Sequence, residues 1–554
     1  MCIILRHVVL LAAAAVLLSP HAYSGSDDVA RFLGYGRSSD ISRAAKGVLN
    51  SKIDMGTLTP ERIREVAKSP EVAELCYLDQ FFSQAGSVRS FVQGELGDKE
   101  FVAWLASHED IFKQLAHSGG GSKETLGFLY KVWKGNNKTL SNVEISMALG
   151  AGLIADKMPP DDCLAKFEFY RTSFNSGKCH PQAGMLEPWE WVIVLRGRES
   201  IPDLTWAQEF IEPKNIKPEK AGSRFAGFIP YRKENEKGVS IHKGAAFYDH
   251  KPITLKLYTE YGGVCGAVSS GASGFLRAKG VPAYTIGQPG HCAFLWKHPK
   301  GHWEIGNNIS GWNWSTGKSQ LPWGGPVAFH RTYNSFLGHP NADESRVMYY
   351  LSFCTQKPEN AELLLREAVA ANPYNYPAWQ RYLTAKAKNA TDEQKMAYLK
   401  EFAGAMPDEN NMIWHVAQNI LKIKEKRVNP YELYACVVGP NCTRDAEEFF
   451  TRQVWNKLVA DCPQIKPIAE YKAGFRGRYL SVFVEKSKAA KWSAKMKKHT
   501  ASMLEESIKV LQNQDETRKY YLETYKSMLE IWNDKAMDER FVEFMGKVPS
   551  EGGS

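Results

Sequence analysis

The segment from Gly262 to Pro282 constrains the fold of this chain more than any other part of the sequence. Two adjacent glycines allow a close backbone approach before Cys265, and a run rich in Gly, Ala and Ser then extends to Gly280. This pattern predicts a helix that begins at or near Cys265 and ends at Gly280, with proline just beyond it. Because each internal glycine costs up to about 1 kcal/mol relative to alanine, the helix must gain stability by close packing, and we expect a sheet as its partner.

The residues after this helix predict an antiparallel meander. Residues 283–288 are typical of a strand, Gln288-Pro289-Gly290 of a turn, and a second strand is expected to begin with His291. A third strand is expected within residues 302–308. This order places a histidine at the start of one strand and polar residues at the end of the next. Such an arrangement suits a nucleophile, a base and a group that orients the base.

The expected position of Cys265 favours a reactive thiol. Unpaired backbone N–H groups and the helix dipole at a helix N-terminus stabilise a thiolate, and a nearby histidine adds to this effect. The pKa of a thiol can fall from about 8.5 to roughly 3.5–7.5 in such surroundings. The same N–H groups can stabilise an oxyanion. The pattern does not identify a second oxyanion donor, although Tyr258 and Tyr261 lie nearby in the sequence.

The segment resembles the transglutaminase-like superfamily, which has a papain-like core. The resemblance rests on the order Gly-x-Cys, a helix with Leu-Arg-Ala-x-Gly-Val-Pro-Ala, then Gly-His-x-x-x-x-Trp and Trp-x-x-x-Asn. It implies that Cys265 is the nucleophile and His291 the general base. The third residue of the family is usually Asp, and the matching position, four after Trp303, is Asn307. Asn308 is the neighbouring alternative. Asparagine can orient a histidine but supplies no charge to stabilise imidazolium.

The resemblance implies acyl transfer through a Cys265 thioester, and we expect hydrolysis of peptide or amide bonds in a peptide or protein substrate. An amine acceptor would instead make the chain a crosslinking enzyme. The alternative is a catalytically inactive transglutaminase-like domain that serves as a binding or scaffold protein between helical interaction domains, which the departure at Asn307 leaves open. No phosphate loop, dinucleotide fingerprint or nucleic-acid-binding motif is present, so we expect no cofactor and no nucleic-acid partner.

A metal site is a further reading of this segment, and we do not favour it. Pro299 and Gly301 indicate a hairpin turn between the last two of its potential ligands. Adjacent residues on a strand face opposite sides, so the first two of the potential ligands would diverge. The potential ligands are His291, Cys292, His298 and His302.

The chain has 554 residues, and single cores stop growing near about 250–300 residues, so several domains are expected. We expect an α+β transglutaminase-like core at 236–335, flanked by mostly α-helical domains at 25–155 and 345–554, with a connecting region at 156–235. The Pro-x-x-x-Pro-Ala-Trp pattern at 373–379 resembles a tetratricopeptide-type helix pair. The run 191–195 could be a strand or a short helix. His180, just before a proline, is expected to be structural.

The N-terminus is typical of a secretory signal peptide over residues 1–24. An apolar run from Val8 to Leu18 follows a short basic region and precedes Ala22-Tyr23-Ser24, a small-x-small cleavage pattern. We therefore expect a secreted or periplasmic protein without stable membrane insertion, in a compartment that permits disulfides. Ten cysteines are present, and Cys436 and Cys442 flank turn-forming residues that would suit a local disulfide bond.

Overall fold

The computed structural model describes residues 25–423 and 491–548, apart from gaps at 36–37, 85–96, 109, 156, 289, 310, 313–314, 407–408 and 511–514, together with a few residues between 428 and 488. It divides into two compact units. Unit 1 comprises residues 1–308, 318–325 and 333–378, and unit 2 comprises 309–317, 326–332 and 379–554. The first unit therefore joins the expected N-terminal domain, connecting region and core, and it also takes in residues 345–378 of the expected C-terminal domain.

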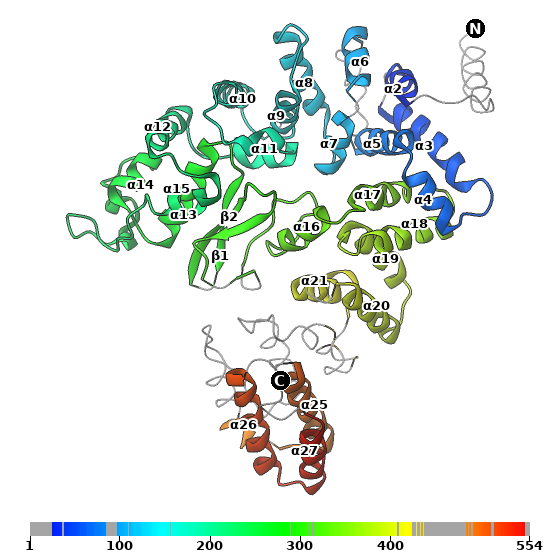
Figure 1. Cartoon of the computed structure of the whole chain (residues 1–554), viewed down its shortest axis with the longest axis vertical. Helices are drawn as coiled ribbons and strands as arrows, with labels where there is room; N and C mark the ends of the chain where they lie inside the picture. The colour runs from blue at the N-terminus through cyan, green and yellow to red at the C-terminus, as the bar shows by residue number, and fades with distance from the viewer. Residues whose placement is uncertain are drawn as a thin grey trace. The chain divides into compact units, whose positions relative to one another are not determined.

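The N-terminal part of unit 1 is helical, as the sequence predicts (Figure 1). The expected cap at Thr59 is present, with its side chain accepting a hydrogen bond from Arg62 N and with Pro60 in the first turn. Aromatic side chains such as Phe101 and Trp133 are buried between the helices. The helices are α2 (Gly25–Leu33), α3 (Ser38–Asp54), α4 (Pro60–Ala67), α5 (Pro70–Gln84), α6 (Lys99–Ala106), α7 (Asp110–His117), α8 (Lys123–Gly135) and α9 (Asn142–Gly152).

The expected connecting region is also helical and packed. Trp191 is fully buried, and residues 191–195 belong to a helix, which settles the choice between strand and helix. Pro188 stands in the first turn of that helix, where its missing N–H costs nothing. The elements are α10 (Pro160–Asn175), η1 (Pro181–Met185), α11 (Pro188–Leu195), α12 (Ile201–Ile211), η2 (Glu212–Lys214), η3 (Pro218–Lys220), α13 (Ala221–Ala226) and η4 (Ile241–Tyr248).

The predicted helix and meander are present in unit 1. Helix α14 (Leu255–Tyr261) leads into α15 (Cys265–Ala278), and Gly280 follows with φ 69°, the left-handed conformation expected after a helix end. Strands β1 (Ala283–Gln288), β2 (His291–Lys297) and β3 (Trp303–Gly306) form one antiparallel sheet in the order β1-β2-β3. Gln288 pairs with His291 at one end, and Lys297 pairs with Trp303 at the other. Helix α15 packs on β1 and β2 (Figure 1).

The glycines of α15 explain its close packing, but their neighbours differ from the expected sheet. A Cβ at Gly271 would lie 2.7 Å from Ile229 Cδ1. A Cβ at Gly274 would lie 2.4 Å from Leu255 Cδ2 and 2.9 Å from Glu199 Oε1. Because these glycines have no Cβ, α14 and the segments before it can pack closely against this face of α15. The sheet packs on another face of the helix.

Substitution of Gly274 by alanine is expected to destabilise unit 1 by about 1–3 kcal/mol, because the added methyl group overpacks this contact. The matched control is Gly266→Ala, since no atom lies within 4 Å of a Cβ at that position. That variant is expected to be neutral or stabilising by up to about 1 kcal/mol. Urea unfolding followed by circular dichroism measures both changes. Equal free energies of unfolding for the two variants would contradict this account of the helix.

His180 has the structural role expected of it. Its backbone N–H donates to Lys279 O at 2.7 Å, its ring accepts a hydrogen bond from Gln182 N, and its side chain is 9% exposed. Burial and the nearby Lys279 ammonium lower the pKa of His180 to about 4. The folded protein therefore keeps this ring neutral at pH values where the unfolded chain protonates it.

Replacement of His180 by asparagine is expected to flatten the pH dependence of stability. Because its folded-state pKa is depressed, His180 contributes stability above about pH 6.5 that is lost progressively as pH falls toward 4, by about 1.4 kcal/mol per pH unit. Asparagine retains an acceptor for Gln182 N but does not titrate. Urea unfolding of both proteins from pH 7.5 to 4.5 measures the difference. Identical pH profiles would contradict the neutral, buried state of His180.

The remaining helices contain the expected helix pair. Helix α18 (Pro358–Ala371) and α19 (Tyr376–Ala387) flank the turn that carries the Pro-x-x-x-Pro-Ala-Trp pattern. Asn372 and Asn375 fix that turn, since their amide groups donate to Phe336 O and Ser345 O. The other helices are α16 (Phe329–Leu337), α17 (Ala342–Leu351), α20 (Asp392–Ala405), α21 (Asn410–His415), η5 (Val416–Ile420), α25 (Ala494–Val510), α26 (Asp515–Trp532) and α27 (Lys535–Lys547).

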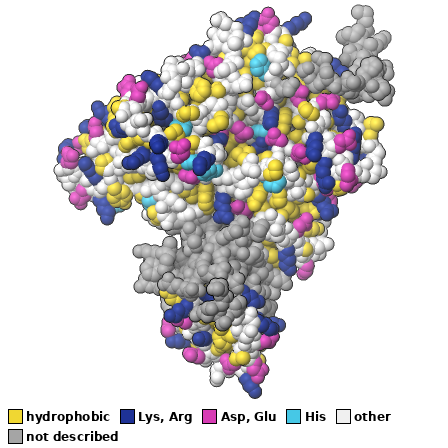
Figure 2. All heavy atoms as spheres, in the orientation of Figure 1, with side chains coloured by type: hydrophobic (Ala, Val, Ile, Leu, Met, Phe, Trp, Pro, Cys, Tyr) yellow, Lys and Arg dark blue, Asp and Glu magenta, His cyan; other side chains and the backbone are white. Residues whose placement is uncertain are grey.

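The last three helices of unit 2 pack around Glu505, which accepts hydrogen bonds from Tyr525 Oη and from the guanidinium of Arg540. The face drawn in Figure 2 carries interspersed basic and acidic side chains over the described residues, in keeping with the modest net charge of +9. Among the described helices, none combines the length and the apolar composition needed to cross a membrane.

Five of the described cysteines have free thiols in this structure: Cys76, Cys163, Cys179, Cys265 and Cys292. Cys442 lies outside the described residues, so the disulfide bond suggested between it and Cys436 stays a prediction.

Candidate functional site

The N-terminus of α15 is fixed by the two glycines that precede it. Gly262 has φ 72° and ψ −148°, a conformation that only glycine adopts without strain, and a Cβ there would lie 2.2 Å from Pro230 O. Gly263 N donates to Pro230 O at 3.0 Å, and a Cβ at Gly263 would lie 2.5 Å from the Ala267 side chain. The chain therefore turns sharply between α14 and α15, and Cys265 becomes the first residue of the helix.

Cys265 is half-buried and stands beside open space. The backbone N–H groups of Cys265 and Gly266 have no acceptor among the described residues, as expected in the first turn of a helix. No atom lies within 4 Å of a Cβ at Gly266, so a substrate could approach there. These two N–H groups are the donors that this structure offers to an oxyanion formed at the thiol.

His291 is held by a backbone carbonyl. It opens β2 opposite Gln288, and its Nε2 lies 2.6 Å from Asn307 O. A carbonyl oxygen only accepts, so Nε2 carries the proton of the neutral ring and Nδ1 is the basic nitrogen. The ring can therefore take a proton at Nδ1 while Asn307 O fixes its orientation.

The side chain of Asn307 has a different role from the carbonyl. Its Nδ2 donates to Ser269 Oγ at 3.0 Å and to Cys292 O at 3.1 Å, and Ser269 Oγ itself donates to Cys292 O at 2.7 Å. Asn307 has φ 53°, which turns its carbonyl toward His291 while its amide binds the neighbouring strand. Asn308 Oδ1 accepts from Gln288 Nε2 at 2.8 Å, so both asparagines tie β3 to the β1–β2 hairpin.

The sequence predicts the orienting residue but not the atom that contacts the histidine. Ser269, which the sequence analysis did not single out, is one helical turn after Cys265 and fully buried. Its hydrogen bonds join α15 to β2 and β3, so Cys265, His291 and Asn307 come from elements joined at one end of the sheet. A serine at i+4 from the thiol, on the sheet-facing side, is the signal that could have identified it.

The thiol of Cys292 lies close enough to that of Cys265 for the two to interact electrostatically. Burial raises the pKa of Cys292, and the adjacent Cys265 thiol raises it further. No hydrogen bond joins Cys265 to His291 among the described residues. The two side chains therefore lie at one end of the sheet but are not joined by a hydrogen bond in the described structure.

The tyrosines considered as oxyanion donors are engaged elsewhere. Tyr258 Oη accepts from Arg198 Nη2 at 2.5 Å, and Tyr261 Oη donates to Asp249 at 2.6 Å. Neither hydroxyl forms a hydrogen bond to Cys265 among the described residues. The helix N–H groups therefore remain the oxyanion donors that the geometry supports.

The β2–β3 hairpin brings together a group that could hold a metal ion. Ligand atoms of His298, His302 and Glu304 lie within 4.8 Å of one another. Glu304 was not foreseen as a member, while His291 and Cys292, at the far end of β2, do not belong to the group. His302 Nε2 and Glu304 Oε1 lie 2.8 Å apart, and the rings of His298 and His302 stack, so these side chains also satisfy one another directly.

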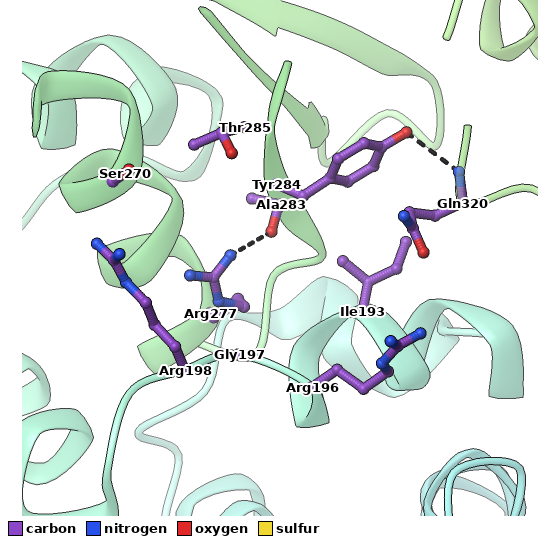
Figure 3. Close-up of a pocket in the computed structure, with 10 residues that line it drawn as sticks. All are labelled: Ile193, Arg196, Gly197, Arg198, Ser270, Arg277, Ala283, Tyr284, Thr285 and Gln320. Atoms are coloured by element: carbon purple, nitrogen blue, oxygen red, sulfur yellow. Dashed lines mark hydrogen bonds between the residues drawn. The ribbon is translucent and has the colours of Figure 1, made fainter. Parts of the chain in front are cut away.

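A pocket of about 300 Å³ lies beside α15 and β1 (Figure 3). It is rich in arginine, and Arg277 Nη1 donates to Ala283 O across its floor at 2.5 Å. On another side, Gln320 N donates to Tyr284 Oη at 3.3 Å. The lining residues are Ile193, Arg196, Gly197, Arg198, Ser270, Arg277, Ala283, Tyr284, Thr285 and Gln320.

A larger cavity, of about 530 Å³, lies among the helices of unit 1, with His117, Glu187 and Arg346 in its wall. Its charges are mutually satisfied. In the tautomer that satisfies all three groups, His117 Nε2 accepts from Arg346 Nη1 at 3.0 Å and His117 Nδ1 donates to Glu187 Oε1 at 3.3 Å. Burial and the Arg346 guanidinium lower the pKa of His117, so the ring is neutral and accepts from arginine. These contacts account for the cluster as a buried structural network.

Comparison of the Asn307→Gly and Asn307→Val variants distinguishes the role of the Asn307 carbonyl in orienting His291 from that of the Asn307 side chain. Glycine adopts φ 53° without strain and keeps the carbonyl beside His291, so histidine-dependent reactivity of Cys265 should stay within about threefold. A β-branched valine is strongly disfavoured at that φ and should displace the carbonyl, with a loss of at least about tenfold. Iodoacetamide labelling of Cys265 at pH 6 measures both. Equal losses in the two variants would indicate that the amide side chain orients His291.

Comparison with known proteins yields no match to a family model, a curated protein or a solved structure.

Proposed function

We propose that this chain is an exported, thiol-dependent acyl-transfer enzyme of transglutaminase-like type that hydrolyses peptide or amide bonds. In this proposal, α15 and the three-stranded sheet form the transglutaminase-like core, and residues 1–24 are a signal peptide that directs the protein to the periplasm or outside the cell. The observation that carries the proposal is the position of Cys265 at a helix N-terminus, at the sheet end where Asn307 O holds His291 by Nε2.

The first half of the reaction forms a thioester. The Cys265 S–H proton passes to His291 Nδ1, and the thiolate attacks the carbonyl carbon of the substrate. The N–H groups of Cys265 and Gly266 stabilise the oxyanion. The carbon–nitrogen bond then breaks, and the imidazolium returns its proton to the leaving amine. Attack by the thiolate requires a movement of Cys265 or His291 into contact, which substrate binding would supply.

The second half releases the acyl group. His291 Nδ1 takes a proton from water, the resulting hydroxide attacks the thioester carbon, and the carbon–sulfur bond breaks. The proton returns to sulfur, which restores the thiol and frees a carboxylic acid. An amine in place of water would give transamidation by the same steps. The open space beside Gly266 leaves room for either acceptor, and hydrolysis is proposed because the protein is expected to be exported.

Acyl-enzyme formation tests this function directly. Addition of p-nitrophenyl acetate to the mature protein should give a stoichiometric burst of p-nitrophenolate and an acetyl group on Cys265 that hydroxylamine removes. Peptide mapping by mass spectrometry identifies the modified residue. His291→Ala should slow the burst by about 10²–10⁴-fold, the usual contribution of a general base. Acetylation of lysines alone, without a burst, would overturn the proposal.

A catalytically inactive binding or scaffold protein is the second candidate. Two observations favour it: Cys265 and His291 share no hydrogen bond among the described residues, and a neutral carbonyl replaces the carboxylate that would stabilise imidazolium. The helical flanks would then bind a protein partner. Under this reading the p-nitrophenyl acetate burst is absent in the unmodified protein and in His291→Ala alike.

A further inference from the structure

The pocket beside α15 contains more positive charge than its surroundings neutralise. Three arginines line it: Arg196, Arg198 and Arg277. Arg277 is neutralised by Glu199, with Nε 3.0 Å from Oε2. Arg198 donates to the Tyr258 hydroxyl and makes no ion pair among the described residues, although its charge favours the ionised forms of Glu199 and Asp203 nearby. Arg196 and Arg198 therefore have no carboxylate in direct contact among the described residues.

Of the three arginines, Arg196 has the fewest polar contacts with described residues. It follows the last residue of α11, its side chain is exposed, and it makes no hydrogen bond or ion pair to any described residue. Figure 3 shows Arg196 on the side of Gln320, whereas Arg198 extends toward Ser270. The guanidinium groups of Arg196 and Arg198 therefore stand on either side of Arg277, and both side chains are exposed.

The rest of the lining offers donors suited to an oxyanion. Hydroxyl groups of Ser270 and Thr285 and the amide of Gln320 accompany the guanidinium groups. Thr285 lies on β1, an edge strand of the sheet, and its side chain is exposed. A guanidinium presents two parallel N–H groups that match a carboxylate, so a carboxylate is the ligand class best recognised by this set.

The pocket lies close to the thiol. Ser270 is five residues after Cys265 on α15, which corresponds to about 7.5 Å along the helix axis. On β1, Thr285 precedes Gln288, the partner of His291, by three residues, or about 10 Å. An extended peptide advances about 3.3 Å per residue, so two or three residues span the distance from the thiol to the near wall of the pocket at Ser270 and Thr285, toward which Arg198 extends.

We infer that this pocket binds a carboxylate of the acyl-donor substrate, so that the preferred substrate is a peptide with an acidic side chain or terminus two or three residues from the carbonyl that Cys265 attacks. This inference rests on the proposed function. It assigns specificity to Arg196 and Arg198, and neither residue takes part in the chemical steps.

The first test compares a negatively charged and a neutral reagent at the same thiol. The rate of Cys265 alkylation by iodoacetate, divided by the rate with iodoacetamide, reports the local potential and does not depend on whether His291 activates the thiol. The double variant Arg196→Gln, Arg198→Gln should lower this ratio by about threefold or more at low ionic strength, and 0.5 M NaCl should reduce the difference. Arg224→Gln, an exposed arginine on α13, is the matched control and should leave the ratio unchanged.

The second test measures binding without chemistry. The Cys265→Ser protein is titrated calorimetrically with acetylated, amidated Glu-Ala-Ala-Ala-Glu and with its Gln-Ala-Ala-Ala-Gln counterpart. The acidic peptide should bind about tenfold more tightly, the energy of one charged hydrogen-bonded contact. The arginine double variant should remove that preference, and Arg224→Gln should keep it.

The outcomes separate this inference from the proposed function. An unchanged reagent ratio together with equal binding of the two peptides overturns the carboxylate pocket, even if Cys265 acylates rapidly. If the protein prefers the acidic peptide but Cys265 is not acylated, the result supports carboxylate binding in this pocket and contradicts the proposed enzymatic function. A preference that persists in the arginine double variant also overturns the inference, because it places the acidic contact elsewhere.

Discussion

Replacement of Cys265 by serine is expected to abolish acyl transfer, with a loss of at least about a thousandfold in the rate of acylation. Serine is isosteric, so the helix terminus and its N–H groups persist. Its hydroxyl, however, has a far higher pKa than a thiol, and the described partner of His291 Nε2 is the neutral Asn307 carbonyl, which cannot strengthen His291 as a base in the way a carboxylate would. Burst kinetics with p-nitrophenyl acetate measure the change.

Cys292→Ser is the matched control for this prediction. The Cys292 thiol adjoins that of Cys265, and burial raises the pKa of Cys292, so it should be a poor nucleophile at neutral pH. Its replacement should leave acylation within about threefold of the unmodified protein, since no proposed step uses it. If Cys292→Ser removed the burst and Cys265→Ser did not, the nucleophile would have been assigned to the wrong residue.

Replacement of Glu199 by glutamine is expected to give the largest loss of stability, about 3–5 kcal/mol, because it leaves the buried Arg277 charge without a partner. Glu199 and Arg277 are 5% and 8% exposed. Burial opposes ionisation, but the Arg277 guanidinium holds the pKa of Glu199 below its ordinary value. Arg277 also donates to Ala283 O, so the ion pair joins α15 to the start of β1 and to the segment before α12. Urea unfolding at pH 7 measures the loss.

Glu260→Gln provides the control for charge removal alone. Glu260 pairs with Lys256 on the surface of α14, where the side chains are 50% and 60% exposed. Such a pair contributes about 0.3–0.5 kcal/mol, so its loss should hardly change the free energy of unfolding. A loss below about 1 kcal/mol for Glu199→Gln would show that the unpaired Arg277 finds solvent or another partner.

Local sequence signals accounted for the elements around the site. Gly262 and Gly263 before Cys265, and Gly280 after the helix, marked the ends of α15 because glycine is needed at those backbone angles. The Gln-Pro-Gly turn placed His291 at the start of β2, where the structure has it. The mostly helical flanks were also foreseen. These features depend on neighbours in the chain, so they can be read without tertiary information.

Other features depend on residues that are distant in the sequence. The run Trp191–Leu195 is apolar in any conformation, and its burial inside unit 1 selects the helix. The glycines of α15 meet Ile229, Leu255 and Glu199, which no local pattern connects to them. The arginine pocket arises only when α15, β1 and the end of α11 come together.

The position of Asn307 could be predicted from the local sequence, but its hydrogen bonds depend on residues that are distant in the sequence. The spacing from Trp303 predicted its place near His291, but a sequence does not specify whether the side chain or the carbonyl makes the contact. That choice follows from φ 53° and from Ser269, which attracts the amide away from the imidazole. The surrounding fold therefore determines which hydrogen bonds Asn307 makes.

The rate of Cys265 alkylation as a function of pH, measured by mass spectrometry on the mature protein with His291→Ala for comparison, tests the central claim most directly. An activated cysteine–histidine pair predicts rapid labelling well below the free-thiol pKa of about 8.5 and its loss in His291→Ala. A disulfide bond at Cys265, or labelling that rises only near that pKa and does not depend on His291, would contradict the proposed acyl-transfer activity. The binding or scaffold protein would then be the remaining candidate function.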